Sequence, residues 1–256
     1  MHKHKWTPTG LFDEQGDIRA PCIDPKCEAY MVKHGDEYIV HQKGFGASIH
    51  GMKLLLEDDK KGGVAKLICK EVEESYHLDT IDFHDGDVVL DIGAHIGVIS
   101  IYLAKKYPGL RIYAFEPIEA NFQNMLANIE ANQAIDITPV NCAVTGDGRD
   151  IQIGGDSSQN TGGFSMYSRQ NPVTVHSVTL EQIFKAYHIE RVKLLKIDCE
   201  GCEYEVLRPH MLGRVDHLRG ELHVGGSIPY WVAEQALNTY RQHVNDMQFT
   251  ISDIGG

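Results

Sequence analysis

The stretch Val88-Val-Leu-Asp-Ile-Gly-Ala-His-Ile-Gly97 leads from an apolar segment into a glycine-rich turn, which a second apolar segment, 98–104, follows. This order is typical of a short buried strand, a tight turn and the start of a helix. Gly93 and Gly97 allow the backbone to turn sharply and to approach a ligand closely, because glycine has no Cβ. We therefore expect a ligand over the helix N-terminus, at the carboxyl edge of a parallel sheet.

The next predicted strand, Arg111-Ile-Tyr-Ala-Phe-Glu-Pro117, ends in an acidic residue. Glu116 follows the glycines by roughly 20 residues, the spacing at which a carboxylate reaches the ribose of a bound nucleotide. NAD and S-adenosylmethionine both carry a ribose. The spacing Gly-x-x-x-Gly lacks the pattern of pyrophosphate-binding turns, and an acidic Asp91 suits a sulfonium cation better than a pyrophosphate. In the purely structural alternative, Asp91 caps a helix and the two glycines only permit close packing.

Strand and helix patterns alternate along the chain, which indicates an α/β fold with a mostly parallel, Rossmann-like sheet and helices on both faces. We expect strands near 87–91, 111–115, 137–141, 193–198 and 218–224, and helices near 96–106, 118–132, 179–188, 202–211 and 230–243. A final strand near 247–253 is expected to pair antiparallel at the sheet edge.

Residues 81–256 form the predicted ligand-binding domain, and residues 1–80 form an N-terminal extension. Within the extension we expect a strand at 38–41 and a helix at 64–76. We expect it to act as a lid or to contact substrate or a second subunit. The segment 150–178 is predicted to be a hairpin or a substrate-facing loop.

The composition excludes several classes of protein. The net charge of −12 argues against broad binding to nucleic acid, which needs a basic surface. No apolar run approaches the ~18 residues of a membrane span, and the first residues lack an apolar signal core, so we expect a cytoplasmic protein that does not bind membranes. The sequence leaves open whether the protein forms a homo-oligomer.

The chain has six cysteines, and their spacing does not resemble a disulfide framework. We expect all of them to stay reduced. Cys199 and Cys202 form a C-x-x-C motif, for which redox chemistry and zinc binding are alternatives, but two small buried hydrophobes beside a turn is the favoured interpretation.

A second group of polar residues follows the buried segment 192–197. Asp198 and Glu200 come at its carboxyl end, on the sheet edge predicted for Glu116, while Glu203 suits the first turn of the next helix as a simple cap. Glu221 and His223 lie on one face of the following strand, because side chains alternate with period two. Together with Asp198 they predict either a general base or a divalent cation site.

These segments, in this order, resemble the FkbM family of S-adenosylmethionine-dependent methyltransferases over about residues 85–250. The resemblance rests on 89–97, 114–117, 141–144, 179–180, 195–203 and 221–223. The segment Leu195-Lys-Ile-Asp-Cys-Glu-Gly-Cys-Glu203 is its most distinctive part, and it departs from the family pattern at Cys202, where alanine is usual.

The resemblance implies a Rossmann-like class I methyltransferase fold and a set of cofactor contacts. The methionine pocket would be shaped by Asp91, Gly93, Ala94, His95 and Gly97. Glu116 would hold the ribose, flanked by Pro117 and Asn121; Cys142 and Ala143 would meet the adenine; and Asp198 would lie near the amino group or the methyl group.

The implied reaction is O-methylation of a hydroxyl on a sugar, glycan or secondary metabolite, with Asp198, Glu200 or His223 as the base that takes the hydroxyl proton. Methylation of nitrogen or carbon on a peptide or other small molecule, an NAD-linked oxidoreductase and an inactive binding protein stay as alternatives. Mg²⁺ at Asp198 and Glu221 is a further hypothesis, because it prefers oxygen ligands. Acceptor contacts are expected from 1–50, 154–168 and 225–231, including the aromatic residues Phe164, Tyr167, Tyr230 and Trp231.

Overall fold

The structure is a computed structural model that describes residues 11–12, 18–21, 29–34, 37–42, 45–56, 63–155, 165–225 and 228–253. Side chains are described for 46–56, 65–155, 165–225 and 228–253. The predicted contacts from Phe164 and from residues 1–45 therefore lie outside the described side chains. None of the described helices is long and apolar enough to cross a membrane.

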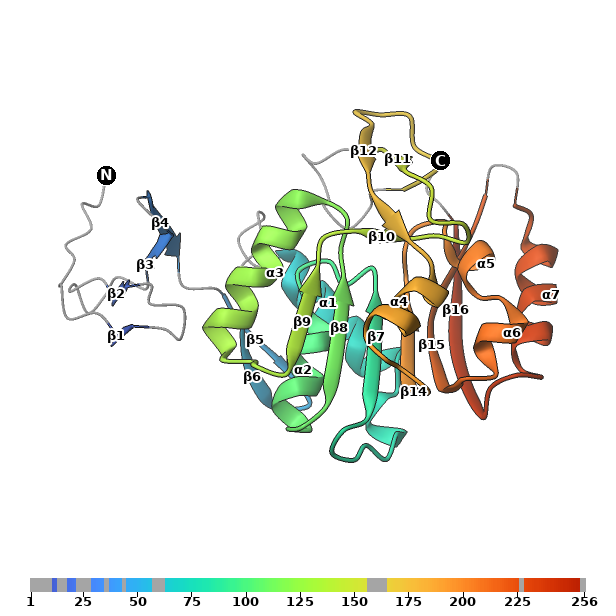
Figure 1. Ribbon diagram of the computed structural model, residues 1–256, viewed down its shortest axis with the longest axis horizontal. Helices are drawn as coiled ribbons and strands as arrows, with labels where there is room; N and C mark the ends of the chain where they lie inside the picture. Colours follow the sequence, from blue (N-terminus) through green and yellow to red (C-terminus); the bar gives the residue numbers. More distant parts are fainter. Residues whose placement is uncertain are drawn as a thin grey trace.

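Six parallel strands form the central sheet, in the order β16-β15-β14-β7-β8-β9 (Figure 1). The strands are β7 (Val88–Ile92), β8 (Arg111–Phe115), β9 (Ile137–Val140), β14 (Val192–Ile197), β15 (Val215–Val224) and β16 (Asp246–Asp253). The chain order reverses between β7 and β14, the position at which open α/β sheets bind ligands. The predicted Rossmann-like sheet is confirmed.

The predicted antiparallel edge strand is wrong, because β16 runs parallel to β15 from His217 opposite Asp246 to Val224 opposite Asp253. The physical reason is the connection between the two strands. Helix α7 (Tyr230–Tyr240) carries the chain back across the sheet, so β16 starts at the same end as β15. A direct hairpin would have reversed its direction.

Helices cover both faces of the sheet (Figure 1). One apolar cluster joins β7 to α4 (Leu180–Ala186), α5 (Glu203–Val206), α6 (Pro209–Leu212) and α7. The other joins the sheet to α1 (Gly63–Glu74), α2 (Val98–Lys106) and α3 (Glu119–Asn132). Within β7, Leu90 belongs to the first cluster and Val89 to the second, as the alternation of side chains along a strand requires.

The single helix predicted for 202–211 is two short helices, α5 and α6. Arg208 has extended backbone geometry, and Pro209 begins α6. A residue that precedes proline avoids the helical region because it would clash with the proline ring, so the helix breaks there.

Shorter elements complete the fold. They are β1 (Leu11–Phe12), β2 (Ile18–Pro21), β3 (Ala29–His34), β4 (Glu37–Gln42), β5 (Phe45–Ile49), β6 (Met52–Leu56), the 3-10 helix η1 (Leu78–Thr80), β10 (Ala143–Val144), β11 (Ile151–Ile153), β12 (Val173–Val175) and β13 (Ser177–Val178). The antiparallel pair β11–β12 confirms the predicted hairpin. Buried residues from β5, β6 and α1 share a core with the sheet, so this part of the extension packs on the domain.

Candidate active site

A cavity of about 200 Å³ opens at the carboxyl edge of the sheet, where the strand order reverses. Its wall is built from α1, the β7–α2 turn, the end of β8, β10, β11, the end of β14 and β15. Nine residues predicted to bind the cofactor line it: Gly93, Ala94, His95, Glu116, Pro117, Asn121, Cys142, Ala143 and Asp198. Asp91 and Gly97 do not.

Asp91 lies beneath the turn, fully buried. Its Oδ2 accepts from the Ser100 hydroxyl at 2.7 Å, and its Oδ1 lies 3.4 Å from the Lys196 ammonium. Lys196 is itself buried and donates to the Gly93 carbonyl at 2.6 Å. Burial alone would lower the pKa of Lys196, but Asp91 and Asp198 outweigh burial and raise it. Asp91 therefore supports the turn from below instead of facing a sulfonium.

The backbone donors of the glycine turn are already used within the protein. The amides of Gly93 and Ala94 both donate to the Phe115 carbonyl, and the Gly97 amide donates to the Ala94 carbonyl. The His95 amide donates to Glu116 Oε2 at 2.9 Å. Because a pyrophosphate is held mainly by free backbone amides, this turn is a poor pyrophosphate site.

Gly93 is required by close packing as well as by its backbone angle. Its φ is +75°, and a Cβ at this position would lie 1.8 Å from the Asp198 carbonyl oxygen. The absence of a side chain therefore brings the β7 turn against the end of β14. This contact places Asp198 beside the glycine turn.

Glu116 forms a buried acidic wall of the cavity. Its Oε1 accepts from the Ile118 amide at 2.9 Å and from the Asn121 side chain at 3.4 Å. Burial raises the pKa of Glu116 to about 7, although these hydrogen bonds favour the ionised form. A carboxylate held in this way can still accept from the hydroxyls of a ligand, since each oxygen has further acceptor capacity.

Four further carboxyl groups line the cavity: Glu71 of α1, Asp198, Glu200 and Glu221. Burial raises the pKa values of Glu200 and Glu221 to about 7. It also raises the pKa of Glu71, with a further contribution from Asp198. The cavity wall therefore holds carboxyl groups that exchange protons near neutral pH.

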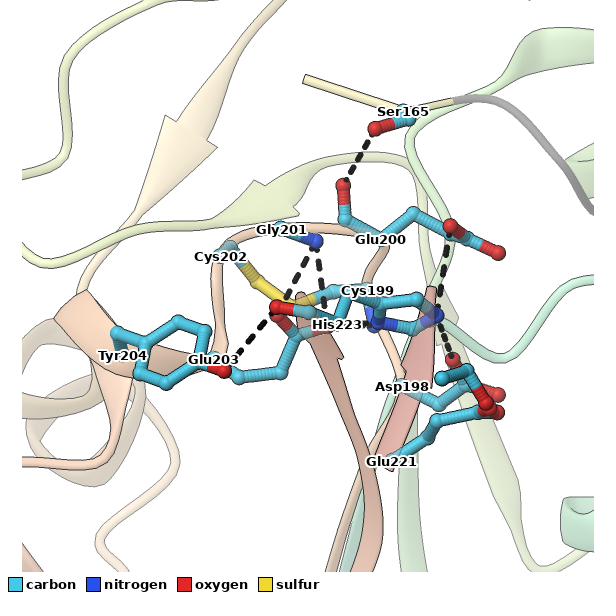
Figure 2. Close-up of polar contacts among 12 residues, drawn as sticks. Ser165, Asp198, Cys199, Glu200, Gly201, Cys202, Glu203, Tyr204, Glu221 and His223 are labelled. Atoms are coloured by element: carbon cyan, nitrogen blue, oxygen red, sulfur yellow. Dashed lines mark hydrogen bonds and ion pairs between the residues drawn. A yellow bond between two sulfur atoms is a disulfide. The ribbon is translucent and has the colours of Figure 1, made fainter. Parts of the chain in front are cut away.

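His223 lies behind these acids and does not line the cavity (Figure 2). Its Nε2 is 3.4 Å from Glu200 Oε2 and 3.9 Å from Asp198 Oδ1, and its Nδ1 is 3.0 Å from Glu203 Oε1. Burial lowers the pKa of His223, but Glu203, Glu200 and Asp198 outweigh burial and raise it to about 9. His223 is therefore an imidazolium at neutral pH and cannot take a proton there.

Glu203 does more than cap a helix, which is all that the sequence predicted for it. It is fully buried and accepts from the amides of Cys199 at 3.1 Å and Gly201 at 3.1 and 3.2 Å, besides its contact with His223 (Figure 2). One carboxylate thus holds both the 199–202 turn and the imidazolium. The sequence placed Glu203 only in the first turn of a helix, and no local pattern indicated that His223 would reach it.

Sequence reasoning also missed Tyr76, Glu71 and Lys196. The Tyr76 hydroxyl donates to Asp198 Oδ2 at 3.2 Å, and Tyr76 lines the cavity with Glu71. Both residues come from the segment treated as an extension, where no motif distinguished them. Lys196 did have a signal, since it is a charged residue at a buried position of an apolar strand.

Two sets of ligand atoms have spacing suited to a cation. Oxygens of Glu71, Asp198 and Glu221 lie within 4.8 Å of one another, as do ligand atoms of Asp198, Glu200 and His223. The first set contains only carboxylates, which suit Mg²⁺ better than a charged imidazolium does. The predicted pair Asp198 and Glu221 is thus joined by Glu71.

Among the predicted aromatic contacts whose side chains are described, none lines the cavity. Tyr230 and Trp231 are 58% and 63% exposed at the start of α7, and neither lines the cavity. Tyr167 lies outside the cavity lining and packs on Gly201, with its hydroxyl 3.4 Å from the Gly201 carbonyl.

Cys199 and Cys202 form a disulfide, so the expectation that all cysteines stay reduced is wrong for this pair. The turn between β14 and α5 brings their Cα atoms to 5.7 Å, within the range that a disulfide spans. Cys69 and Cys142 are free and buried.

Comparison with known proteins agrees with this geometry. Residues 91–225, more than half of the chain, match the methyltransferase FkbM domain. The chain belongs to the FkbM methyltransferase family.

Several curated relatives are named methyltransferases. "Methyltransferase 1" of Beauveria bassiana is 26% identical over 56% of this chain and 66% of its own length. "Hexuronic acid methyltransferase AglP" of Haloferax volcanii is 23% identical over 63% of this chain and 62% of its own length. The chain therefore spans slightly less than two thirds of either relative. Among solved structures, precorrin-6y C5,15-methyltransferase from Geobacter metallireducens is 14% identical with a TM-score of 0.39, covering 65% of this chain and 67% of that one, a likeness too distant to bear on function.

Proposed function

We propose that this protein is an S-adenosylmethionine-dependent O-methyltransferase that acts on a hydroxyl of a sugar, glycan or secondary metabolite. The observation that carries the proposal is one cavity whose wall combines two features. It is lined by Glu116 and the glycine turn, and also by carboxyl groups that exchange protons near neutral pH. The Haloferax volcanii relative is named a hexuronic acid methyltransferase, which is in keeping with a sugar acceptor.

The residues around Glu116 and the glycine turn fit S-adenosylmethionine. Glu116 would accept from ribose hydroxyls, and the apolar side chains of Ile118, Cys142 and Val144 would face the adenine. Asp198 would meet the amino group. When bound, S-adenosylmethionine supplies an electrophilic methyl group on a sulfonium.

Glu200 is the proposed general base. It lines the cavity, and burial places its pKa at about 7, so it can take the proton of an attacking hydroxyl. Asp198, which also lines the cavity and accepts from Tyr76, would orient the hydroxyl. His223 acts as a positioning residue, because as a charged group it holds both carboxylates from behind.

The charge of the cavity favours oxygen over nitrogen as the methyl acceptor. Carboxylates raise the pKa of a neighbouring amine and keep it protonated, which removes the lone pair that would attack. They assist a hydroxyl by accepting its proton. An N-methyltransferase of alkyl amines would be better served by a neutral site.

The NAD alternative is disfavoured by the glycine turn, whose amides at Gly93, Ala94, His95 and Gly97 are already donated within the protein. An inactive binding protein would retain the cofactor contacts around Glu116 without needing Glu200. The NAD alternative therefore differs from an active methyltransferase in the cofactor that it binds, and the inactive protein differs in the absence of methyl transfer.

Isothermal titration with S-adenosylmethionine, S-adenosylhomocysteine and NAD tests the cofactor. We expect the first two to bind, and Glu116→Gln to weaken binding by about tenfold or more, the worth of a hydrogen bond to a charged group. Glu119→Gln is the matched control, since Glu119 is an exposed acid on α3 outside the cavity lining. Binding of NAD alone would refute the cofactor assignment.

Methyl transfer from labelled S-adenosylmethionine to a panel of hydroxylated and aminated sugars tests the reaction. We expect methyl ethers as products, with turnover falling in Glu200→Gln while cofactor affinity stays close to that of the wild type. Methylated amines as the main products would support the alternative acceptor, and cofactor binding without any transfer would support an inactive protein.

A further inference from the structure

We propose that Cys199 and Cys202 form a reversible thiol–disulfide exchange site in the wall of the cavity, whose redox state sets how Glu203 holds His223. The co-reactants are small thiols and disulfides of the glutathione type. This inference goes beyond methyl transfer and does not depend on the identity of the cofactor.

The disulfide bridges the turn that carries the proposed base. Cys199 follows Asp198, and the bridged loop contains Glu200 and Gly201 (Figure 2). Glu200 has a φ of +54°, a left-handed backbone that costs a residue with a side chain free energy. A covalent bridge across this turn limits the conformations to which Glu200 could relax.

The bridge is also next to the Glu203–His223 pair. Sγ of Cys199 lies 3.6 Å from Glu203 Oε1, the same oxygen that accepts from His223 Nδ1 at 3.0 Å. In the disulfide this sulfur has no proton to donate. In the reduced form the Cys199 thiol can donate to Glu203 Oε1 and so compete with His223 for it.

The rest of the turn has contacts that do not depend on the bridge. The Ser165 hydroxyl donates to the Glu200 carbonyl at 3.0 Å, and the Met166 amide donates to it at 3.2 Å. Two Gly201 amide contacts to Glu203 remain as well. Reduction is therefore expected to change the local hydrogen bonds without unfolding the turn, as a reversible site requires.

Both cysteines line the cavity, but they differ in exposure. Cys199 is half-buried, whereas Cys202 is 3% exposed, so Cys199 is the more accessible to a small thiol. A reducing thiolate would attack Cys199, break the S–S bond and leave Cys202 as the thiolate. A second thiolate then releases Cys199 from the mixed disulfide, so two thiols are oxidised to one small disulfide while the protein pair gains two electrons and two protons. Oxidation by a small disulfide is the reverse.

The test is a redox titration of the whole protein in glutathione buffers, with free thiols trapped by alkylation and measured by peptide mass spectrometry. We expect Cys199 and Cys202 to change together in a single two-electron transition. In parallel, NMR at fixed pH is expected to show the His223 Nδ1 proton moving upfield on reduction, because its hydrogen bond to Glu203 weakens.

Two variants separate the bridge from general effects of thiol reagents. Cys202→Ala should give the reduced-state His223 signal in excess reduced glutathione and should lack the intramolecular bridge at every ratio, since its Cys199 can form only a mixed disulfide in oxidised glutathione. Cys69→Ala removes a buried free thiol outside the cavity lining and should leave the transition of the wild-type pair unchanged.

Three results would overturn the proposal. They are thiols that stay reduced in fully oxidised glutathione, a bridge that folded protein retains in excess reduced glutathione, and a His223 signal that is the same in both redox states. The first two concern the exchange site and the third its link to Glu203. None depends on whether S-adenosylmethionine binds.

Discussion

The buried pair of Glu203 and His223 predicts a pH-dependent contribution to stability. The pKa of His223 is raised from 6.5 to about 9 in the folded protein. Because the folded state binds the proton more tightly, the stabilisation is fully present below pH 6.5 and is lost as the pH rises through about 9. At 1.36 kcal/mol for each pH unit, the difference is worth about 3 kcal/mol.

A double-mutant cycle measures the coupling free energy between Glu203 and His223. Glu203→Gln keeps the size of the side chain and one acceptor but removes the charge, and His223→Asn keeps a donor and removes the other charge. The free energy of unfolding in urea is measured for the four proteins near pH 6.5 and near pH 10. We expect a coupling free energy between about 1 and 3 kcal/mol at the lower pH, because Glu200 and Asp198 share in raising the pKa, and close to zero at the higher pH.

His217 provides the matched control. It contacts Asp246 at 3.1 Å near the surface, where an ion pair contributes at most about 1 kcal/mol, so His217→Asn should change stability little at either pH. NMR titration of the His223 ring is expected to give a lower pKa in Glu203→Gln, because Glu203 contributes most to raising it and Glu200 and Asp198 remain. A coupling below about 1 kcal/mol near pH 6.5, or one that is equal at both pH values, would refute the reasoning.

Three further predictions follow from single contacts. Gly93→Ala should lower the free energy of unfolding by more than about 4 kcal/mol in urea or thermal denaturation, since the added Cβ would overlap the Asp198 carbonyl. Gly86→Ala is the control: Gly86 has a φ of +83° but open space around it, so this change should cost only about 1–2 kcal/mol. Tyr76→Phe should cost about 1–2 kcal/mol by the same assay, because it removes one hydrogen bond to a carboxylate, and an unchanged stability would contradict that contact. If the carboxylate set holds a cation, MgCl₂ should raise the melting temperature of EDTA-treated wild type but not of Glu221→Gln; no rise in the wild type would remove the metal hypothesis.

Much of the fold follows from local pattern. The apolar segment before Gly93 and the glycines after it specify a strand, a turn and a helix start through backbone sterics alone. The direction of β16 differs from the antiparallel prediction because the crossover through helix α7 returns the chain to the end of the sheet at which β15 starts. The break at Pro209 was written in the sequence and is a matter of backbone geometry.

The site could be predicted from the sequence only in part, because a motif gives the position of a charged residue along the chain and not the residues it contacts. Glu116, at the end of the second strand, lies on the cavity as predicted, whereas Asp91, in the glycine motif of the first strand, turns away toward Ser100 and Lys196. Tyr76 reaches Asp198 across 122 positions of the sequence. No local pattern could indicate that contact.

The sequence by itself therefore determined the order of strands and helices, the glycine turn and the sheet edge at which the acids gather, because these depend on side-chain periodicity and on the allowed backbone angles of neighbouring residues. The tertiary structure decided which of the acids carry a proton and what each one holds. Protonation depends on burial and on charges brought close by folding, as when Glu203 meets His223 at 3.0 Å and keeps it charged. That pairing holds His223, one of the three predicted bases, away from the cavity lining, whereas Asp198 and Glu200 both line the cavity.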